Sequence, residues 1–158
     1  MELGRKGLNV VMIARPSDKL TAAAAEVEAA TKVTVRTIGF DFSVDGGHES
    51  YAKLRAELAE YDVGVLVNNV GVSYPSALFF DEWETYDAGG ALKMINVNVT
   101  AVTKMTQFVL PIMLKRAGRN KGVIINVASA AGRIPTGNPL YAEYSASKVR
   151  CVCLLACE

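Results

Sequence analysis

The sequence predicts an α/β fold built on a doubly wound parallel sheet, and two observations support this prediction. Short apolar segments rich in β-branched residues alternate along the chain with segments of helical periodicity, and the predicted strands are residues 8–14, 33–40, 63–67 and 123–127. The strands are apolar almost throughout, as in Val63–Val67, which is typical of strands covered on both faces. Strands that alternate with helices indicate βαβ units with right-handed crossovers.

Four helices are predicted between and after these strands. Ser17 is a suitable N-cap for the first, whose apolar positions recur at helical spacing: Leu20, Ala24, Val27 and Ala30. The second carries a similar stripe, made of Tyr51, Leu54 and Leu58. The third covers residues 91–116 and is expected to bend or break near Pro111, because proline lacks the amide hydrogen. The fourth begins near Tyr141 and continues to the end of the chain.

Length and composition limit the possible functions. The 158 residues predict one domain, residues 1–158, and 17 Lys+Arg against 16 Asp+Glu give no reason to expect a nucleic-acid partner. The longest uncharged stretch, residues 63–80, contains Asn68 and Asn69, so we expect no transmembrane helix. Three crowded cysteines, Cys151, Cys153 and Cys157, are odd in number and lack a second pair of ligands. They predict reduced, small apolar side chains, with neither a disulfide framework nor a metal site.

Polar residues follow the predicted strands at the positions where a doubly wound sheet binds its ligands. Such sheets bind ligands beyond the carboxyl ends of their strands. The residues at these ends are Arg15, Asp41, Asn68, Asn69, Val70, Gly71 and Ser129. Asn68 and Asn69 form turns readily, and a glycine such as Gly71 allows the backbone to approach a ligand. Each of these residues taken alone is also compatible with an ordinary turn or cap.

Tyr144 and Lys148 are the pair that indicates catalysis. Four residues apart, they share one face of the last helix, so an ammonium can lie close to a phenol. A neighbouring cation favours the phenolate form, which suits a group that transfers a proton near neutral pH. Asn98 is an amide in an otherwise apolar helix and needs a partner when buried, from water or the backbone. Taken alone, a Tyr and Lys pair at this spacing is also common on surface helices.

In this order and at these strand ends, the motifs resemble the short-chain dehydrogenase/reductase family. The segments that carry the resemblance are Asn68–Gly71, Asn98, Ser129 and Tyr144–Lys148. Further segments resemble one branch, the 3-oxoacyl-CoA reductases and 17β-hydroxysteroid dehydrogenases: Asp41–Ser43, Leu66–Pro75, Lys104–Pro111 and Pro139–Tyr141. The similarity extends over essentially the whole chain and implies a Rossmann-like fold.

The resemblance implies reduction of a ketone by hydride from a nicotinamide cofactor. Tyr144 would donate the proton, and Lys148 would make it a stronger acid and bind the nicotinamide ribose. Ser129 would position the carbonyl, and Asn98 would hold a water that relays protons to the lysine. Tyr141 is a rival proton donor, although only Tyr144 has a lysine four residues further on. The substrate would be a 3-oxoacyl-CoA of fatty-acid elongation or a 17-ketosteroid, both small molecules.

Arg15 favours NADPH as the cofactor. It stands at the end of the first strand, where an acidic residue would bind a free ribose 2′-hydroxyl, and an arginine suits a 2′-phosphate. The alternative is an arginine that merely faces solvent. By resemblance, Asp41 would contact the adenine, and Asn69, Val70 and Gly71 would also line the cofactor site.

Several parts of the family pattern are missing from this chain. It has no glycine-rich phosphate-binding turn, the first strand of the sheet is absent, and the strand and lid expected after the catalytic helix are also absent. We therefore expect a partial domain that is weakly active or inactive by itself. The competing hypothesis is a non-catalytic Rossmann-like remnant or dimerisation module. Resemblance further implies a possible homodimer and a place on the cytosolic face of the endoplasmic reticulum membrane, with attachment through a segment outside this chain.

Overall fold

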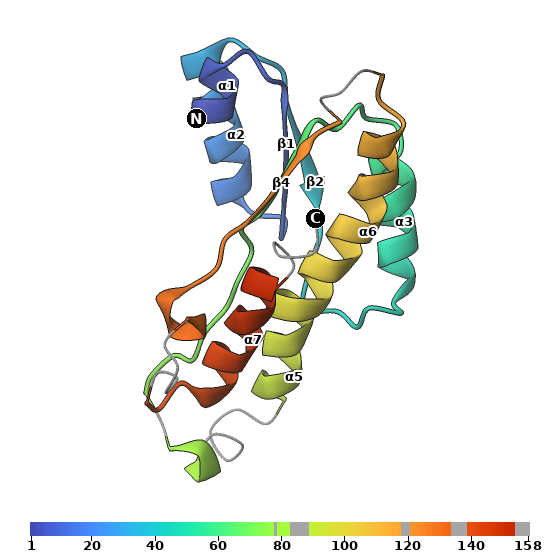
Figure 1. The fold of residues 1–158 in the computed structure, drawn as a ribbon. Helices are drawn as coiled ribbons and strands as arrows, with labels where there is room; N and C mark the ends of the chain where they lie inside the picture. The colour runs from blue at the N-terminus through green and yellow to red at the C-terminus, as the bar shows by residue number, and fades with distance from the viewer. Residues whose placement is uncertain (78, 83–88, 118–120, 134–138, 154–158) are drawn as a thin grey trace. The chain divides into compact units, whose positions relative to one another are not determined.

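The computed structural model describes residues 1–77, 79–82, 89–117, 121–133 and 139–153, with side chains up to Val149 (Figure 1). Cys157 and the side chains of Cys151 and Cys153, predicted to be reduced, lie outside the described part. Contacts divide the chain into two compact units, Met1–Phe42 and Ser43–Glu158, and each unit is described by itself. All four predicted strands are present, in two separate two-stranded parallel sheets.

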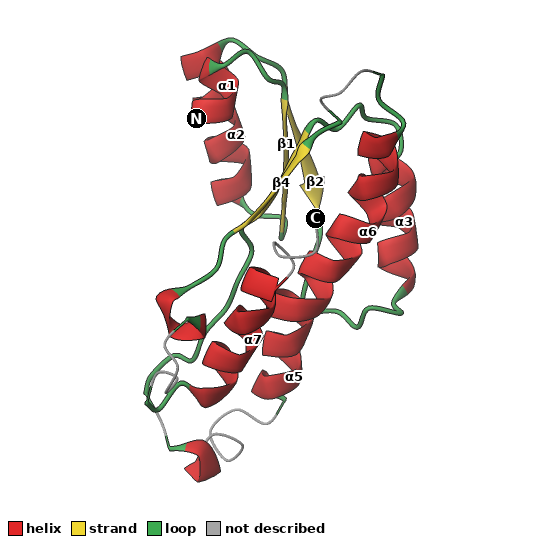
Figure 2. Ribbon diagram, in the orientation of Figure 1, coloured by secondary structure: helices red, strands yellow, loops and turns green. Residues whose placement is uncertain are grey.

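The unit Met1–Phe42 contains a parallel strand pair with a helix packed on it (Figure 2). Its elements are α1 (Glu2–Arg5), β1 (Val10–Ala14), α2 (Asp18–Thr31) and β2 (Val35–Gly39). The strands run in parallel with Val10 opposite Val35, and α2 connects them as the crossover helix. Ser17 caps α2 as predicted, because its side chain accepts a hydrogen bond from the Leu20 amide. The core of this unit consists of Ala24, Val27, Ile38, Phe40 and Phe42.

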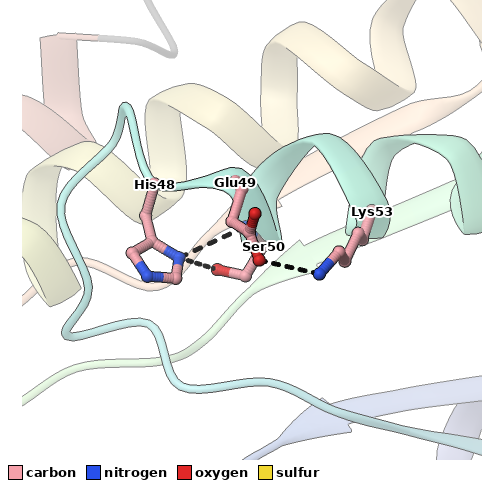
Figure 3. A network of polar contacts seen from close by, with 4 residues as sticks. All are labelled: His48, Glu49, Ser50 and Lys53. Carbon is pink, nitrogen blue, oxygen red and sulfur yellow. Dashed lines mark hydrogen bonds and ion pairs between the residues drawn. The ribbon is translucent and has the colours of Figure 1, made fainter.

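The unit Ser43–Glu158 begins with α3 (Glu49–Leu58), whose predicted stripe of Tyr51, Leu54 and Leu58 is buried. Exposed polar groups organise the first turn of this helix (Figure 3). His48 is its N-cap and accepts a hydrogen bond at Nδ1 from the Ser50 amide, 3.2 Å away. Lys53 pairs with Glu49 one turn earlier at 2.8 Å, and this ammonium lowers the pKa of the Glu49 carboxyl. The only histidine of the chain is thus an exposed helix cap.

The second strand pair consists of β3 (Val65–Asn68) and β4 (Val123–Asn126). The two strands are parallel, with Val65 opposite Val123 and Asn68 opposite Asn126. The Asn68 amide donates to Asn126 Oδ1 at 2.8 Å and to Thr106 Oγ1 at 3.3 Å, so it ties both strands to the long helix behind them. These bonds fix the carboxyl ends of β3 and β4, where the loops that carry Gly71 and Ser129 begin.

The predicted third helix is continuous but changes its geometry at a different place from the one expected. It comprises α5 (Gly90–Ile95), the π-helical segment η1 (Asn96–Thr100) and α6 (Ala101–Leu114). The prediction of a break near Pro111 is wrong in that α6 continues past this residue. Pro111 is exposed, so water can bind the carbonyl that lacks its helical partner. The departure from α-helical geometry lies at η1 instead.

This helix also bears on the expectation of no transmembrane segment. The helix Gly90–Leu114 contains an 18-residue window with a mean hydropathy of 1.3, and by length and composition only it is long and apolar enough to cross a membrane. The core helix of a soluble protein passes the same test. One face of this helix lies in the core of its unit. Its buried residues include Met94, Val97, Ala101, Met105 and Val109.

The last described elements are the 3₁₀ helix η2 (Ala130–Gly132) and α7 (Ala142–Cys153). α7 packs against η2, η1 and α5, and Figure 1 shows it alongside α5. The predicted fourth helix is confirmed from Ala142 to Cys153, and residues 154–158 lie outside the described part. Its inner face meets η2, η1 and α5.

Candidate active site

Tyr144 and Lys148 lie one turn apart on α7, as their spacing predicts. The ammonium nitrogen of Lys148 is 5.9 Å from the centre of the Tyr144 ring, within the range of a cation–π contact. Lys148 is 6% exposed, whereas Tyr144 is half-buried. The arrangement differs from a surface pair, because the lysine has been withdrawn from water and remains beside the phenol.

The ammonium group of Lys148 is buried and makes a single hydrogen bond in the part of the chain that the structure describes. Within the described residues, its one hydrogen bond is to the carbonyl oxygen of Val127, at 3.4 Å. An ammonium group carries three donors, and burying it without acceptors is costly. The group is therefore placed to donate further hydrogen bonds to a bound molecule.

Asn98 connects the loop after β3 to α7. It is 1% exposed, and its side-chain oxygen accepts from the Val72 amide at 2.8 Å. Its amide nitrogen donates to the Val72 carbonyl and to Ser147 Oγ, each at 2.9 Å. The buried amide was expected to need a partner from water or the backbone. It binds the backbone of Val72 and, in addition, the hydroxyl of Ser147.

Gly71 lies where the loop after β3 passes Lys148. A side chain at this position would place its Cβ 2.9 Å from Lys148 Nζ and 3.4 Å from Asn98 Oδ1. The absence of a side chain therefore leaves room for the ammonium beside the loop. Asn69 and Val70 precede Gly71 and are exposed. The structure thus brings Gly71, Asn98, Tyr144 and Lys148 together at one place.

Ser129 follows β4 and caps η2, accepting a hydrogen bond from the Ala131 amide at 3.3 Å. Its element packs on α7 through Gly132. A Cβ at Gly132 would lie 2.7–2.9 Å from backbone atoms of Lys148 and Val149. The close approach of η2 thus supports α7 at Lys148. Ser129 itself also has the cap role that was its alternative interpretation.

Replacing Gly132 by alanine is expected to destabilise the unit Ser43–Glu158. The neighbouring atoms are helix backbone, which cannot rotate away, so η2 and α7 must separate. Overpacking of this kind costs about 1–3 kcal/mol in the free energy of unfolding, measured by urea denaturation. Gly47→Ala is the matched control, because the atom nearest to its new Cβ is the exposed Asp45 carboxylate, 3.1 Å away. Equal effects of the two substitutions would contradict the close packing at Gly132.

Arg15 and Asp41, the predicted cofactor residues outside this cluster, belong to the unit Met1–Phe42. Arg15 directly follows β1, Asp41 follows β2, and both residues are exposed. Because β1 and β2 are parallel, the two residues lie at the same edge of their strand pair.

Three residues with a place in this site were not singled out by the sequence analysis: Ser147, Gly132 and Tyr74. Ser147 is buried, lies three residues after Tyr144, and directly precedes Lys148. Its helical spacing from Tyr144 is a sequence signal that could have identified it. Gly132 and Tyr74 act through segments distant in the sequence, and no local pattern identifies them.

Comparisons with known proteins find relatives that align with most of this chain. The very-long-chain 3-oxoacyl-CoA reductase of Homo sapiens is 42% identical over 147 residues, covering 93% of this chain and 44% of the relative. The enzyme of the same name from Anas platyrhynchos is 44% identical over 152 residues, covering 93% of this chain and 45% of the relative. The chain therefore spans less than half the length of these relatives.

Solved structures share the fold. A metagenomic short-chain oxidoreductase in complex with NADP is 30% identical, with a TM-score of 0.78 over 98% of this chain and 65% of that protein. A short-chain dehydrogenase from Sphingobium yanoikuyae in complex with NADPH is 26% identical, with a TM-score of 0.78 over 97% of this chain and 56% of that one. These likenesses confirm the predicted Rossmann-like α/β fold. The family model described as short chain dehydrogenase matches residues 1–156, and the chain belongs to this family of oxidoreductases.

Proposed function

We propose that the protein containing this chain reduces a ketone to a secondary alcohol with NADPH, and that its substrate is a 3-oxoacyl-CoA of fatty-acid elongation. The observation that carries the proposal is the buried Lys148 ammonium, which lies beside the Tyr144 ring and the side-chain-free edge of Gly71. The names of the relatives support the choice of substrate. Reduction of a 17-ketosteroid is the second candidate substrate class.

Each of the two units carries residues that suit a nicotinamide cofactor. Among the described residues Lys148 uses one of its donors, which leaves others for ribose hydroxyl groups, and Gly71 leaves space next to them. Arg15, at the end of β1, carries the charge that suits a 2′-phosphate, which favours NADPH over NADH. Asp41 is our candidate for the adenine contact, and Asn69 and Val70 for further contacts of the loop. When bound, NADPH supplies the hydride that reduces the carbonyl carbon.

The side chains supply the proton and the geometry. Tyr144 gives its phenolic proton to the carbonyl oxygen, and the nearby Lys148 ammonium stabilises the negative charge that develops on the phenol oxygen. Ser129 donates to the same carbonyl oxygen and orients it. Asn98 holds the loop and α7 in register, and we propose that it also binds the water that returns a proton toward Lys148.

A non-catalytic Rossmann-like remnant or dimerisation module is the competing function. We propose that the whole protein acts at the cytosolic face of the endoplasmic reticulum membrane, as fatty-acid elongation would require. A homodimer is also proposed, because apolar side chains on α5 and α6 are exposed, namely Leu92, Ile95, Leu110 and Leu114.

A measurement of cofactor binding distinguishes the proposed reductase from the non-catalytic remnant. The purified protein that contains this chain is melted alone, with NADPH, and with NADH, and unfolding is followed by circular dichroism. Nucleotide at about 100 times its dissociation constant should stabilise a fold that binds it by about 2.7 kcal/mol. We expect NADPH to raise the melting temperature and NADH to have little effect. A melt indifferent to both nucleotides would favour the remnant.

Arg15→Glu is expected to reverse the nucleotide preference. Loss of a charge-assisted hydrogen bond, about 1.5–3 kcal/mol, should weaken NADPH binding roughly tenfold to a hundredfold while NADH binding is maintained or improved. Lys19→Glu is the matched control, because it makes the same change of charge on an exposed residue of α2. Equal weakening by both substitutions would show that Arg15 acts only through net charge.

A further inference from the structure

A backbone amide in the first turn of α7, the turn that carries Tyr144, donates a hydrogen bond to a side chain of a distant loop. The first amides of a helix have no partner within the helix, and Ser or Asp at the N-cap commonly supplies one. Here the residue before α7 is Tyr141, which is not a residue of this kind. The Glu143 amide instead donates to the phenolic oxygen of Tyr74, 3.0 Å away. Tyr74 lies in the loop after β3.

Tyr74 is held firmly in this position. It is 8% exposed, and its ring stacks on Tyr141 with centroids 5.5 Å apart and planes 14° from parallel. It also forms a small apolar cluster with Met94, against which Val72 and Tyr144 pack. The Tyr74 hydroxyl in turn donates to the Glu143 carboxylate at 3.4 Å. Burial raises the pKa of Tyr74, which keeps this hydroxyl protonated.

The same loop therefore contacts both ends of the segment that carries the reacting side chains. Gly71 lies beside Lys148 Nζ, and Val72 is bound by Asn98, which also binds Ser147. Three residues after Gly71, Tyr74 binds the helix at Glu143, directly before Tyr144. A shift of this loop would move Tyr144 and Lys148 together with respect to a substrate.

We propose that Tyr74 is a positioning residue for Tyr144: its hydroxyl completes the first turn of α7 and its ring, stacked on Tyr141, fixes where the catalytic phenol lies. This inference rests on the proposed role of Tyr144 as proton donor. The cap itself is independent of that role, so the two can be tested separately.

Tyr74→Phe keeps the ring and removes the hydroxyl. We expect amide hydrogen exchange at Glu143 and Tyr144, followed by NMR, to become about 3- to 10-fold faster, as for the loss of one hydrogen bond. We also expect kcat for ketone reduction to fall about tenfold, with the KM for NADPH unchanged, because the misplaced phenol affects the proton transfer. Tyr61→Phe is the matched control, because Tyr61 lies just beyond α3, outside this cluster.

The outcomes separate the two ideas. Unchanged exchange at Glu143 and Tyr144 would overturn the cap, and faster exchange with unchanged kcat would overturn the positioning role. Faster local exchange in a protein that reduces no ketone in any variant would support the cap while the proposed function fails. Should Tyr74→Phe not fold, Tyr141→Leu removes the stacking partner from the other side. It is expected to speed exchange at the same two amides, and no change there would count against the proposal.

Discussion

Reduction of a 3-oxoacyl-CoA is expected to fall by about 10²- to 10⁴-fold when Tyr144 is replaced by phenylalanine, the range that a positioned acid or base contributes. Phenylalanine keeps the ring that packs against Tyr74 and Met94 and that lies 5.9 Å from Lys148 Nζ. The substitution therefore removes the proton and leaves the packing. Product formation with NADPH is measured by mass spectrometry, which detects even slow turnover.

Tyr141→Phe is the matched control for this prediction. Tyr141 is the rival proton donor, lies three residues earlier, and packs against the same cluster. Phenylalanine retains its stacking on Tyr74, so most of the activity should remain. Loss of activity in Tyr141→Phe together with normal turnover in Tyr144→Phe would contradict the prediction, because it would identify Tyr141 as the proton donor. If the thermal stabilisation by NADPH is unchanged in Tyr144→Phe, the defect lies in the reaction and not in cofactor binding.

The strands and most helices could be predicted because their signals are local. The apolar segments 8–14, 33–40, 63–67 and 123–127 each correspond to an observed strand, with ends that differ by at most two residues. The geometry of the long helix could not be predicted in the same way. Its π-helical segment contains Asn98, whose side chain is bound by Val72 and Ser147, and these residues are distant in the sequence.

The candidate site was predicted where side-chain chemistry is specific and missed where geometry depends on packing. Tyr144 and Lys148 share a helix face by their spacing alone, and Asn98 is recognisable as an amide in an apolar helix. Gly132 resembles any loop glycine until η2 is seen packed on the α7 backbone. Tyr74 resembles any apolar loop residue until its hydroxyl is seen at the Glu143 amide. Their roles arise from tertiary contacts that no local sequence pattern encodes.

Replacing Asn98 by alanine is expected to lower the free energy of unfolding by about 3–4 kcal/mol. The change leaves the Val72 amide and carbonyl and the Ser147 hydroxyl without the partner that now binds all three. A buried polar group left without a hydrogen bond costs about 1–3 kcal/mol, and the truncated side chain also leaves a cavity. Urea denaturation followed by circular dichroism measures the loss.

Asn96→Ala is the matched control for the effect of losing three hydrogen bonds at once. Asn96 lies in the same π-helical segment and is only half-buried. Its side-chain amide donates to the Ser43 carbonyl at 2.9 Å, so the expected loss is about 1 kcal/mol. A similar loss for both variants would mean that the π-helical segment itself is the sensitive feature. A larger loss for Asn98→Ala would instead show that this amide holds the loop after β3 against α7. The loop and helix would then depend on Asn98 for the placement of Gly71 beside Lys148, and the proposed chemistry would depend on the same three hydrogen bonds as the fold.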